Sequence, residues 1–207
     1  MGEVTVIQHP VVQHLLTQLR DERTGSQEFR HLLANLASLL TFEATRTLEV
    51  RSAEVRTPVG EICGSALQRE ILLVPILRAG LGMVEAMRQL LPHPRVGFIG
   101  MKRNEHTLQC ECYHQSLPAA LPDFEVILLD PMLATGGSSV AALGRLRELG
   151  ATRIRLVNLV AAPEGIAHVH RHHPEVPIFT AAIDQKLNAR GYIVPGLGDA
   201  GDRLFGV

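Results

Sequence analysis

The sequence VILLDPMLATGGSS, at residues 126–139, joins a short apolar run to a glycine turn and the start of a helix. The four apolar residues at 126–129 have the length and branching of a strand buried in a sheet. Asp130 stands where that strand should end, residues 134–139 are small, and a helical pattern begins at Val140. This order predicts a strand, a turn with a carboxylate on its rim, and a helix that starts at the turn.

The turn has the chemistry to bind a phosphate group. Two consecutive glycines let backbone N–H groups approach a phosphate closely, and the helix dipole favours negative charge there. The hydroxyls of Thr135, Ser138 and Ser139 can add donors. Since a carboxylate repels phosphate, we expect Asp130 to face sugar hydroxyls or a metal, so a phosphorylated polyol fits best. The alternative is an ordinary strand-to-helix loop, with the glycines for the turn and a serine as the helix cap.

Size and composition favour one compact globular domain. At 207 residues the chain can bury a substantial core, and 46% hydrophobic with 20% charged residues argues against disorder. The formal net charge is −1 and the Lys and Arg residues are scattered, so no nucleic-acid partner is predicted. No apolar run could span a bilayer, the first residues do not resemble a secretory signal, and three cysteines fit a reducing compartment. We therefore expect a cytoplasmic protein without a membrane partner.

Apolar periodicity predicts strands that alternate with helices along most of the chain. We expect strands at residues 48–57, 71–77, 96–101, 126–129, 154–161 and 178–183, and helices at residues 10–20, 26–44, 81–91, 138–149 and 165–173. Residues 60–70 are expected to be irregular, and residues 102–122 to form a long polar loop or functional flap. The predicted fold class is α/β, a mostly parallel sheet with helices on both faces and a small hood or flap.

A single domain over residues 1–207 is expected to have three parts. These are N-terminal helices and a β-arm at about 1–70, a core at about 71–190, and a C-terminal loop at about 191–207. The helix predicted at residues 26–44 has an unusually wide apolar face, made of Phe29, Leu32, Leu33, Leu36, Leu39 and Leu40. Such a face indicates either core packing or a subunit interface.

Two arginines follow predicted strands, as Asp130 does. Arg78 comes after residues 71–77, and Arg103 comes after residues 96–101. Because ligands of open α/β sheets bind beyond the carboxyl ends of the strands, we expect these side chains at one edge. An arginine followed by Ala-Gly can clamp a diphosphate with two hydrogen bonds, although a solvated arginine at a helix start has the same local pattern.

The tail GYIVPGLGDAGDR, at residues 191–203, is rich in glycine yet carries apolar residues. Ile193, Val194 and Leu197 are too apolar for a frayed terminus. The glycines would expose backbone N–H and C=O groups, which could recognise a small planar ligand with amide-like edges. A solvated glycine-rich terminus is the alternative.

Two clusters of histidine and cysteine residues are possible metal sites, but their patterns do not favour metal binding. One contains His168, His170, His172 and His173, and the other contains His106, Cys110, Cys112 and His114. The first has no suitably placed cysteine or acidic partner, and the second lacks the usual C-x₂-C spacing. We predict no protein-built metal site.

Together these stretches resemble the type I phosphoribosyltransferase family and its uracil-specific branch. VILLDPMLATGGSS resembles the family's signature for 5-phospho-α-D-ribose 1-diphosphate (PRPP). PILRAGLGM at residues 75–83 resembles the pyrophosphate-side loop, and GYIVPGLGDAGDRLFG at 191–206 resembles the C-terminal loop of the uracil branch. VAAPEGI at 160–166 and LLTFEAT at 39–45 also match. Asp130-Pro131 stands where most type I members have two acidic residues, a departure that the uracil branch shares.

The resemblance implies that uracil and PRPP react to give UMP and diphosphate, with inversion at the anomeric carbon. It implies a PRPP site made of Arg78, Arg103, Asp130, Pro131, Met132, Leu133, Ala134, Thr135, Gly136, Gly137, Ser138 and Asp199. It implies a uracil site made of Ile193, Gly198, Asp199 and Ala200, and catalytic roles for Asp130, Arg103 and Asp199. Asp199 is the one candidate that we would test as a general base.

The resemblance also implies partners beyond the two substrates. Mg²⁺ is expected as a cofactor, bound mainly through the PRPP diphosphate, while GTP as an activator and a homo-oligomer are further expectations. A regulator that kept the phosphoribosyl site but binds RNA is an alternative, which the near-neutral, scattered charge disfavours. A transferase for another base is a second alternative, which the uracil-type tail disfavours.

Overall fold

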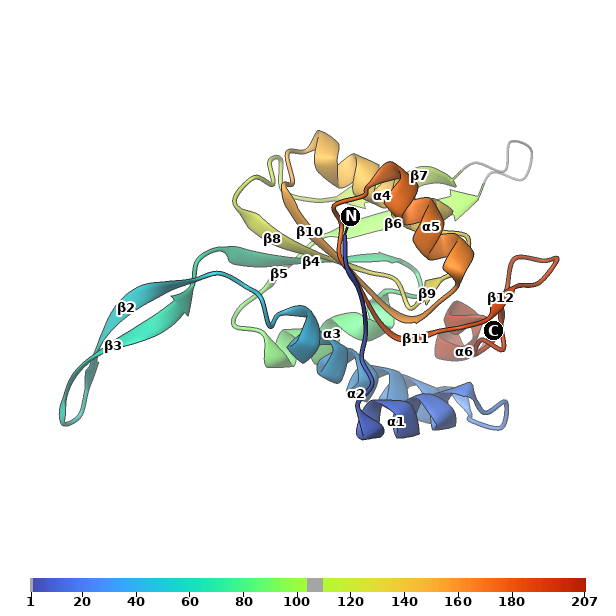
Figure 1. Ribbon diagram of the computed structural model, residues 1–207, viewed down its shortest axis with the longest axis horizontal. Helices are drawn as coiled ribbons and strands as arrows, with labels where there is room; N and C mark the ends of the chain where they lie inside the picture. Colours follow the sequence, from blue (N-terminus) through green and yellow to red (C-terminus); the bar gives the residue numbers. More distant parts are fainter. Residues whose placement is uncertain (1, 104–109) are drawn as a thin grey trace.

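The protein, seen in a computed structural model, is built around a twisted central sheet (Figure 1). The structure describes residues 2–103 and 110–207, without the side chain of Arg103. The strands of the sheet lie in the order β1 (Val4–Val6), β11 (Ile178–Ile183), β10 (Arg153–Ala161), β8 (Phe124–Leu129), β4 (Glu70–Leu77), β6 (Phe98–Arg103) and β7 (Cys110–Ser116). Short strands β5 (Arg95–Val96) and β9 (Met132–Leu133) pair with β4 and β10. The described pairs of this sheet are parallel except β6 with β7, which confirms the predicted sheet.

Helices cover both faces of the sheet, as predicted (Figure 1). One face packs against α1 (Pro10–Arg20), α2 (Ser26–Ala44) and α3 (Leu81–Leu90), and the other packs against α4 (Gly137–Glu148) and α5 (Pro163–His172). Alternate residues of β8 serve the two cores, since Ile127 and Leu129 pack with the first group while Val126 and Leu128 pack with the second. All four side chains have 0% exposure, so the apolar run at 126–129 is a strand buried on both faces.

The wide apolar face of α2 is core. Phe29, Leu33, Leu36 and Leu40 each have 0% exposure within the single chain. They pack against α1, α3 and the sheet. The interpretation of this face as a subunit interface is therefore wrong, and a helix between a sheet and two neighbouring helices explains its width.

Residues 60–70 are not irregular, contrary to the prediction. They contain β3 (Gly60–Leu67), which pairs antiparallel with β2 (Val50–Thr57) to form an arm that extends away from the body (Figure 1). The hydroxyl of Thr57 accepts hydrogen bonds from the backbone N–H groups of Val59 and Gly60 at the turn. Most side chains of both strands are exposed, and residues 60–67 lack the alternation of apolar and polar residues that marks a half-buried strand.

The predicted flap and tail also contain regular structure. Part of the flap is β7, an edge strand whose side chains are mostly exposed, which explains its polar sequence. The tail contains β13 (Ile193–Val194), paired with β12 (Lys186–Leu187), and the short helix α6 (Ala200–Phe205). Residues 104–109 of the predicted flap lie outside the described residues. Within the described residues, no helix combines the length and apolar character that a membrane crossing requires.

Candidate active site

A cavity of about 430 Å³ lies where the carboxyl ends of β4 and β8 meet the C-terminal loop, which we define as residues 191–207. Its walls come from three segments far apart in the sequence. It is lined by Ala79, Met132, Ala134, Thr135, Ser138, Arg190, Gly191, Tyr192, Ile193, Gly198, Asp199, Ala200 and Gly201. A site at this edge agrees with the rule that open α/β sheets bind ligands beyond the carboxyl ends of strands.

The phosphate turn, residues 130–139, is fixed to β10 by backbone hydrogen bonds. The carbonyl oxygen of Pro131 accepts from the N–H groups of Leu159 (3.0 Å) and Val160 (3.2 Å), and that of Leu133 accepts from Ala162 (2.9 Å). These contacts use backbone groups of Pro131 and Leu133, which do not line the cavity, so a ligand in the cavity need not displace them.

Gly136 makes the phosphate turn possible. Its φ is +78°, and a Cβ there would stand 2.8 Å from the carbonyl oxygen of Gly165, at the start of α5. Gly136 also precedes α4 without a side-chain cap, so the first N–H groups of that helix are left for a ligand. A helix N-terminus with free N–H groups beside a cavity is suited to an anion.

Asp130 lies directly after β8, at the base of the phosphate turn. Its Oδ1 accepts from the N–H of Met132 at 3.3 Å, and its backbone carbonyl accepts from the side-chain amide of Asn158 at 2.6 Å. Burial raises the pKa of Asp130 to about 6, although the Met132 N–H and the hydroxyl of Ser139 favour the charged form. The carboxylate is thus largely but not fully ionised at neutral pH, and it can accept hydrogen bonds from hydroxyl groups.

The two predicted arginines lie at the same edge of the sheet. Arg78 follows β4 and is exposed, with its guanidinium carbon 5.9 Å from the ring centroid of Phe205 in α6. Its neighbour Ala79 lines the cavity, and a Cβ on Gly80 would stand 2.5 Å from the Leu129 carbonyl oxygen. This loop therefore packs closely against the end of β8. Arg103 ends β6, which pairs with β4, but its side chain lies outside the described part of the chain.

The C-terminal loop forms the opposite wall. Ile193 is 4% exposed and Ala200 3% exposed, so both are firmly packed while touching the cavity. Asp199 caps α6 by accepting from the N–H of Asp202 at 3.0 Å. This cap uses Oδ1 of Asp199 and leaves its other oxygen available at the cavity wall.

Most of the predicted site comes together around this one cavity. Its lining includes Met132, Ala134, Thr135 and Ser138 from the phosphate turn, and Ile193, Gly198, Asp199 and Ala200 from the tail. The predicted residues Arg78, Asp130, Pro131, Leu133, Gly136 and Gly137 do not line it but support or border its walls. Among residues 2–103 and 110–207, no three His, Cys, Asp or Glu side chains gather in a way that would hold a metal. His106, which belongs to the second cluster of histidine and cysteine residues, lies outside the described residues.

Several residues at the site escaped sequence reasoning. Nδ1 of His168, in α5, lies 2.8 Å from the carbonyl oxygen of Thr135, so the imidazole supports the phosphate turn instead of a metal. Sγ of Cys110 lies 3.7 Å from Oγ of Ser138. Arg190 lines the cavity and had no local pattern to mark it. His168 and Cys110 each contact a residue about 30 positions away in the sequence, so no local motif predicts these contacts.

Comparison with known proteins agrees with this geometry. The family model described as uracil phosphoribosyltransferase matches residues 6–207. The chain belongs to the uracil phosphoribosyltransferase family. It is 53% identical over 204 residues to a uracil phosphoribosyltransferase from Thermoanaerobacter sp. strain X514, covering 98% of this chain and 97% of that one. It is 51% identical to a uracil phosphoribosyltransferase from Shouchella clausii, covering 100% and 99% of the two chains.

A solved structure shares the whole fold. The AQ2163 protein from Aquifex aeolicus is 40% identical and superposes with a TM-score of 0.93, covering 99% of this chain and 98% of that one. The uracil phosphoribosyltransferase family match spans both the phosphate turn and the C-terminal loop, the two walls of the cavity. The family resemblance expected from the motifs is thus confirmed.

Proposed function

We propose that the protein converts uracil and PRPP into UMP and diphosphate, a step of pyrimidine salvage. The observation that carries this proposal is one cavity with two unlike walls, an anion-binding turn on one side and a glycine-rich backbone loop on the other. Such walls suit a phosphorylated sugar and a planar base held next to each other. Family membership supports both halves of the assignment.

The phosphate turn is proposed to hold the phosphoribosyl group. Backbone N–H groups of residues 134–138 would surround the 5′-phosphate, helped by the hydroxyls of Thr135 and Ser138. Asp130 would accept hydrogen bonds from the ribose hydroxyls, where an anion is not repelled. These contacts orient the anomeric carbon toward the base, and orientation is a large part of the rate gain in such displacements.

The C-terminal loop is proposed to hold uracil. Ile193 offers an apolar contact, and the backbone of Gly198, Asp199 and Ala200 can pair with the carbonyl and N–H edge of the base. A site built on paired polar groups rejects a base that would leave those groups unpaired. This explains how so small a ligand can be selected.

The displacement forms a bond from N1 of uracil to the anomeric carbon and breaks the bond to the diphosphate oxygen. The electron pair leaves with the diphosphate, and the proton leaves N1; Asp199 is the acceptor to test. Arg78 and Arg103 would stabilise the leaving charge, since preorganised cations act most strongly where charge develops.

Mg²⁺ fits the oxygen donors of this site. Asp199 brings a carboxylate to the cavity wall and Asp130 holds one in the phosphate turn. Mg²⁺ takes one or two protein carboxylates and completes its shell with phosphate and water oxygens. Bound through the PRPP diphosphate, it would offset negative charge on the leaving group. Asp199 is then a ligand candidate as well as a proton acceptor.

The decisive assay is formation of UMP from uracil and PRPP with Mg²⁺. We expect turnover with uracil and none with adenine or guanine in the same mixture. Absence of turnover by folded protein would refute the proposal. Turnover with another base in place of uracil would show that the substrate is that base. Addition of GTP in the same assay tests the proposed activation directly.

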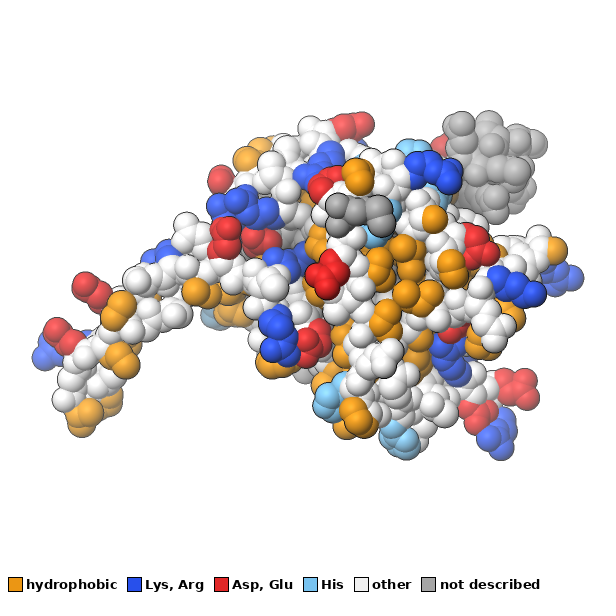
Figure 2. Space-filling view, viewed as in Figure 1, with side chains coloured by type: hydrophobic (Ala, Val, Ile, Leu, Met, Phe, Trp, Pro, Cys, Tyr) orange, Lys and Arg blue, Asp and Glu red, His pale blue; other side chains and the backbone are white. Residues whose placement is uncertain are grey.

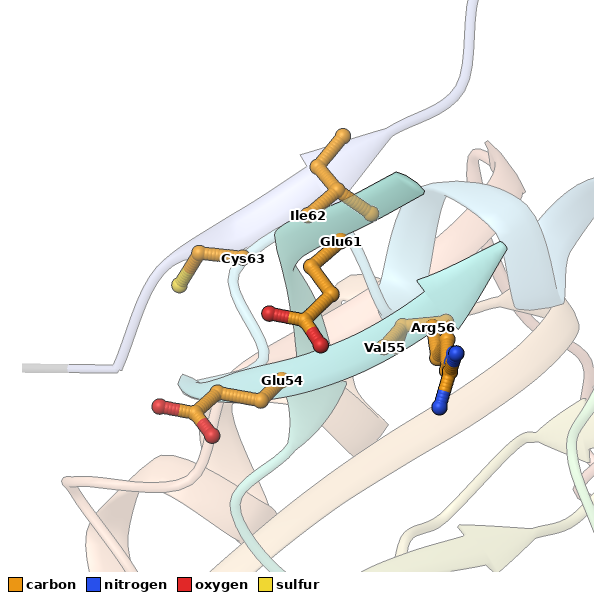
Figure 3. Close-up of a pocket in the computed structure, with 6 residues that line it drawn as sticks. All are labelled: Glu54, Val55, Arg56, Glu61, Ile62 and Cys63. Atoms are coloured by element: carbon orange, nitrogen blue, oxygen red, sulfur yellow. The ribbon is translucent and has the colours of Figure 1, made fainter. Parts of the chain in front are cut away.

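We also propose that the protein is cytoplasmic and that it forms a homo-oligomer through the β2–β3 arm. The arm exposes Val55 (48%), Val59 (97%) and Ile62 (59%), and apolar side chains colour its tip in Figure 2. A hollow of about 460 Å³ on this arm shares no lining residue with the active-site cavity. Its lining side chains, shown in Figure 3, are Glu54, Val55, Arg56, Glu61, Ile62 and Cys63. Clustered exposed apolar groups favour association. Light scattering should give a multiple of 22.6 kDa, and Val59→Asp with Ile62→Asp should reduce it.

A further inference from the structure

A buried ion pair lies behind the C-terminal loop. Arg20, the last residue of α1, donates from Nη1 to Oδ2 of Asp184 (2.8 Å) and from Nη2 to Oδ1 (2.7 Å). The Asp184 side chain is 6% exposed and the Arg20 side chain 22% exposed. Two parallel hydrogen bonds between a guanidinium and a carboxylate give a strongly directional contact.

The same pair holds both polar groups of one glycine. The N–H of Gly196 donates to Oδ2 of Asp184 at 2.8 Å, and its carbonyl oxygen accepts from Nη1 of Arg20 at 2.7 Å. Gly196 has a φ of +63°, and a Cβ there would stand 2.2 Å from the carbonyl oxygen of Ile193. The turn is therefore too tight for another residue, and its position is set by the ion pair.

A second arginine ties the next residue to the same place. Nη1 of Arg203, in α6, donates to the carbonyl oxygens of Leu197 (2.9 Å) and Leu19 (2.6 Å). Its guanidinium carbon lies 4.4 Å from the ring centroid of Phe29, and burial lowers its pKa. Thus two consecutive residues of the C-terminal loop are anchored to the end of α1, more than 170 residues away.

The anchored residues lie between two residues that line the cavity. Ile193 precedes the turn and Gly198 follows it, and both belong to the wall proposed to contact uracil. A buried ion pair is a poor source of stability, because removing two charges from water offsets most of their attraction. An apolar pair would leave the N–H and C=O of Gly196 unsatisfied. The presence of the Arg20–Asp184 pair is explained if its role is to fix the position of Gly196 in the C-terminal loop.

We propose that Arg20 and Asp184 are positioning residues for base recognition. This inference rests on the proposed transfer to uracil. Backbone groups recognise a base only when they stand at the right distance, and a displacement of about 1 Å can lower a rate about 100-fold. The ion pair keeps Gly196 in register, so that Ile193 and Gly198 meet the base while the phosphate turn is unaffected.

The test compares the steady-state kinetics of Arg20→Met, Arg20→Lys and Asp184→Asn with those of the wild type. We expect kcat/KM for uracil to fall about 10- to 100-fold in Arg20→Met and Asp184→Asn, with KM for PRPP within about twofold. Arg20→Lys keeps the charge and part of the donor set, so it should recover part of the loss. If Arg20 and Asp184 only stabilised the fold, the kinetic parameters for uracil and for PRPP would change together.

The matched control is Glu125→Gln. Glu125 pairs with Arg155 at 3.6 Å, their side chains are 7% and 12% exposed, and the pair lies near the amino end of β8, away from the cavity. This variant should lower Tm without changing KM for uracil. If Arg20→Met fails to fold, the Lys and Asn variants, assayed below their Tm, decide the matter.

Two results separate this inference from the proposed function. If the wild type makes no UMP, the proposed function fails, and the positioning role in uracil recognition, which rests on it, is refuted with it. If the wild type makes UMP while the Arg20 and Asp184 variants lose only Tm, or lose both substrates equally, the positioning role is refuted and the proposed function stands.

Discussion

The phosphate turn and the C-terminal loop line the same cavity but are held in different ways. The turn is supported by neighbouring strands, and its key features, Asp130 and Gly136, lie within seven residues of each other. The C-terminal loop is held by Arg20 and Asp184, which come from opposite ends of the chain. One wall is thus a local structure at the end of neighbouring strands, and the other depends on contacts with the distant helix α1.

This difference predicts that substitutions in the two walls affect different substrates. Damage to the phosphate turn should remove PRPP binding without affecting recognition of the base. Damage to the anchors of the C-terminal loop should do the reverse. Variants of the phosphate turn should therefore change the use of PRPP independently of the affinity for uracil.

The largest effect is expected from Gly136→Ala. An alanine with φ near +78° costs roughly 1–2 kcal/mol, and its Cβ would meet the Gly165 carbonyl at 2.8 Å, so the turn must move. We expect kcat/KM for PRPP to fall about 100-fold. The control is Gly144→Ala in the same helix α4, where a Cβ meets no heavy atom within 4 Å among the described residues. Equal activity of both variants would contradict the role of Gly136.

The next largest loss of kcat/KM for PRPP is expected when Asp130 is protonated or replaced by asparagine. Its pKa is raised to about 6, so lowering the pH through 6 protonates the carboxyl and removes an acceptor for the ribose hydroxyls. We expect kcat/KM for PRPP to reach half of its plateau near pH 6 and to level off about one pH unit higher. Asp130→Asn should lower that plateau by about 30-fold, since hydrogen bonds to a charged group contribute about 1.5–3 kcal/mol.

The pH profile of Asp130→Asn provides the control. PRPP itself ionises in the same range, and this contribution is common to both proteins. The wild type should therefore lose more activity than the variant below pH 6. Parallel profiles would show that Asp130 does not titrate in the reaction.

A smaller effect is expected from Arg78→Ala. Arg78 is exposed, so its removal should leave Tm nearly unchanged while kcat/KM for PRPP falls about tenfold. Arg103→Ala should act in the same direction. Arg88→Ala is the control, because Arg88 is also exposed and pairs with Glu85 at 3.3 Å on α3. If Arg78→Ala instead weakens the affinity for uracil, Arg78 acts in base recognition and not in PRPP binding.

The same comparison explains which features could be predicted from the sequence. The phosphate turn was recognisable because a strand, an acidic residue, a glycine turn and a helix follow one another without interruption. The α/β class followed from buried runs such as residues 71–77 and 126–129, whose burial on both faces removes polar residues. Family resemblance then added the base, which no local pattern specified.

Features that depend on distant contacts were not predictable. The strand β3 carries no burial pattern because both of its faces are largely exposed, and β7 is an exposed edge. The α2 face could not be assigned to core or interface until α1 and α3 were in place around it. Arg20 resembles any arginine at a helix end, and only the position of Asp184 shows its partner.

The smallest effect, and the sharpest test of the comparison, concerns His168. A carbonyl oxygen can only accept, so Nδ1 of His168 must donate the hydrogen bond to Thr135. This is a distant contact that supports the otherwise local phosphate turn. Its loss should cost about 1 kcal/mol, the usual contribution of one hydrogen bond, which is about a fivefold increase in KM for PRPP.

His168→Ala and His172→Ala form a matched pair for this test. His172 lies one turn further along α5. Its Nδ1 lies 3.0 Å from the backbone carbonyl oxygen of His168, and its ring packs edge-on against the His168 ring with the centroids 4.9 Å apart, but no contact of His172 with the phosphate turn is seen among the described residues. We expect His172→Ala to leave both KM values unchanged. If His168→Ala also leaves KM for PRPP unchanged, the turn is held entirely by β10 and its own glycines, and the local character of this wall is stronger than the contact suggests. If it raises KM for uracil instead, the two walls are coupled through α5 and do not respond independently.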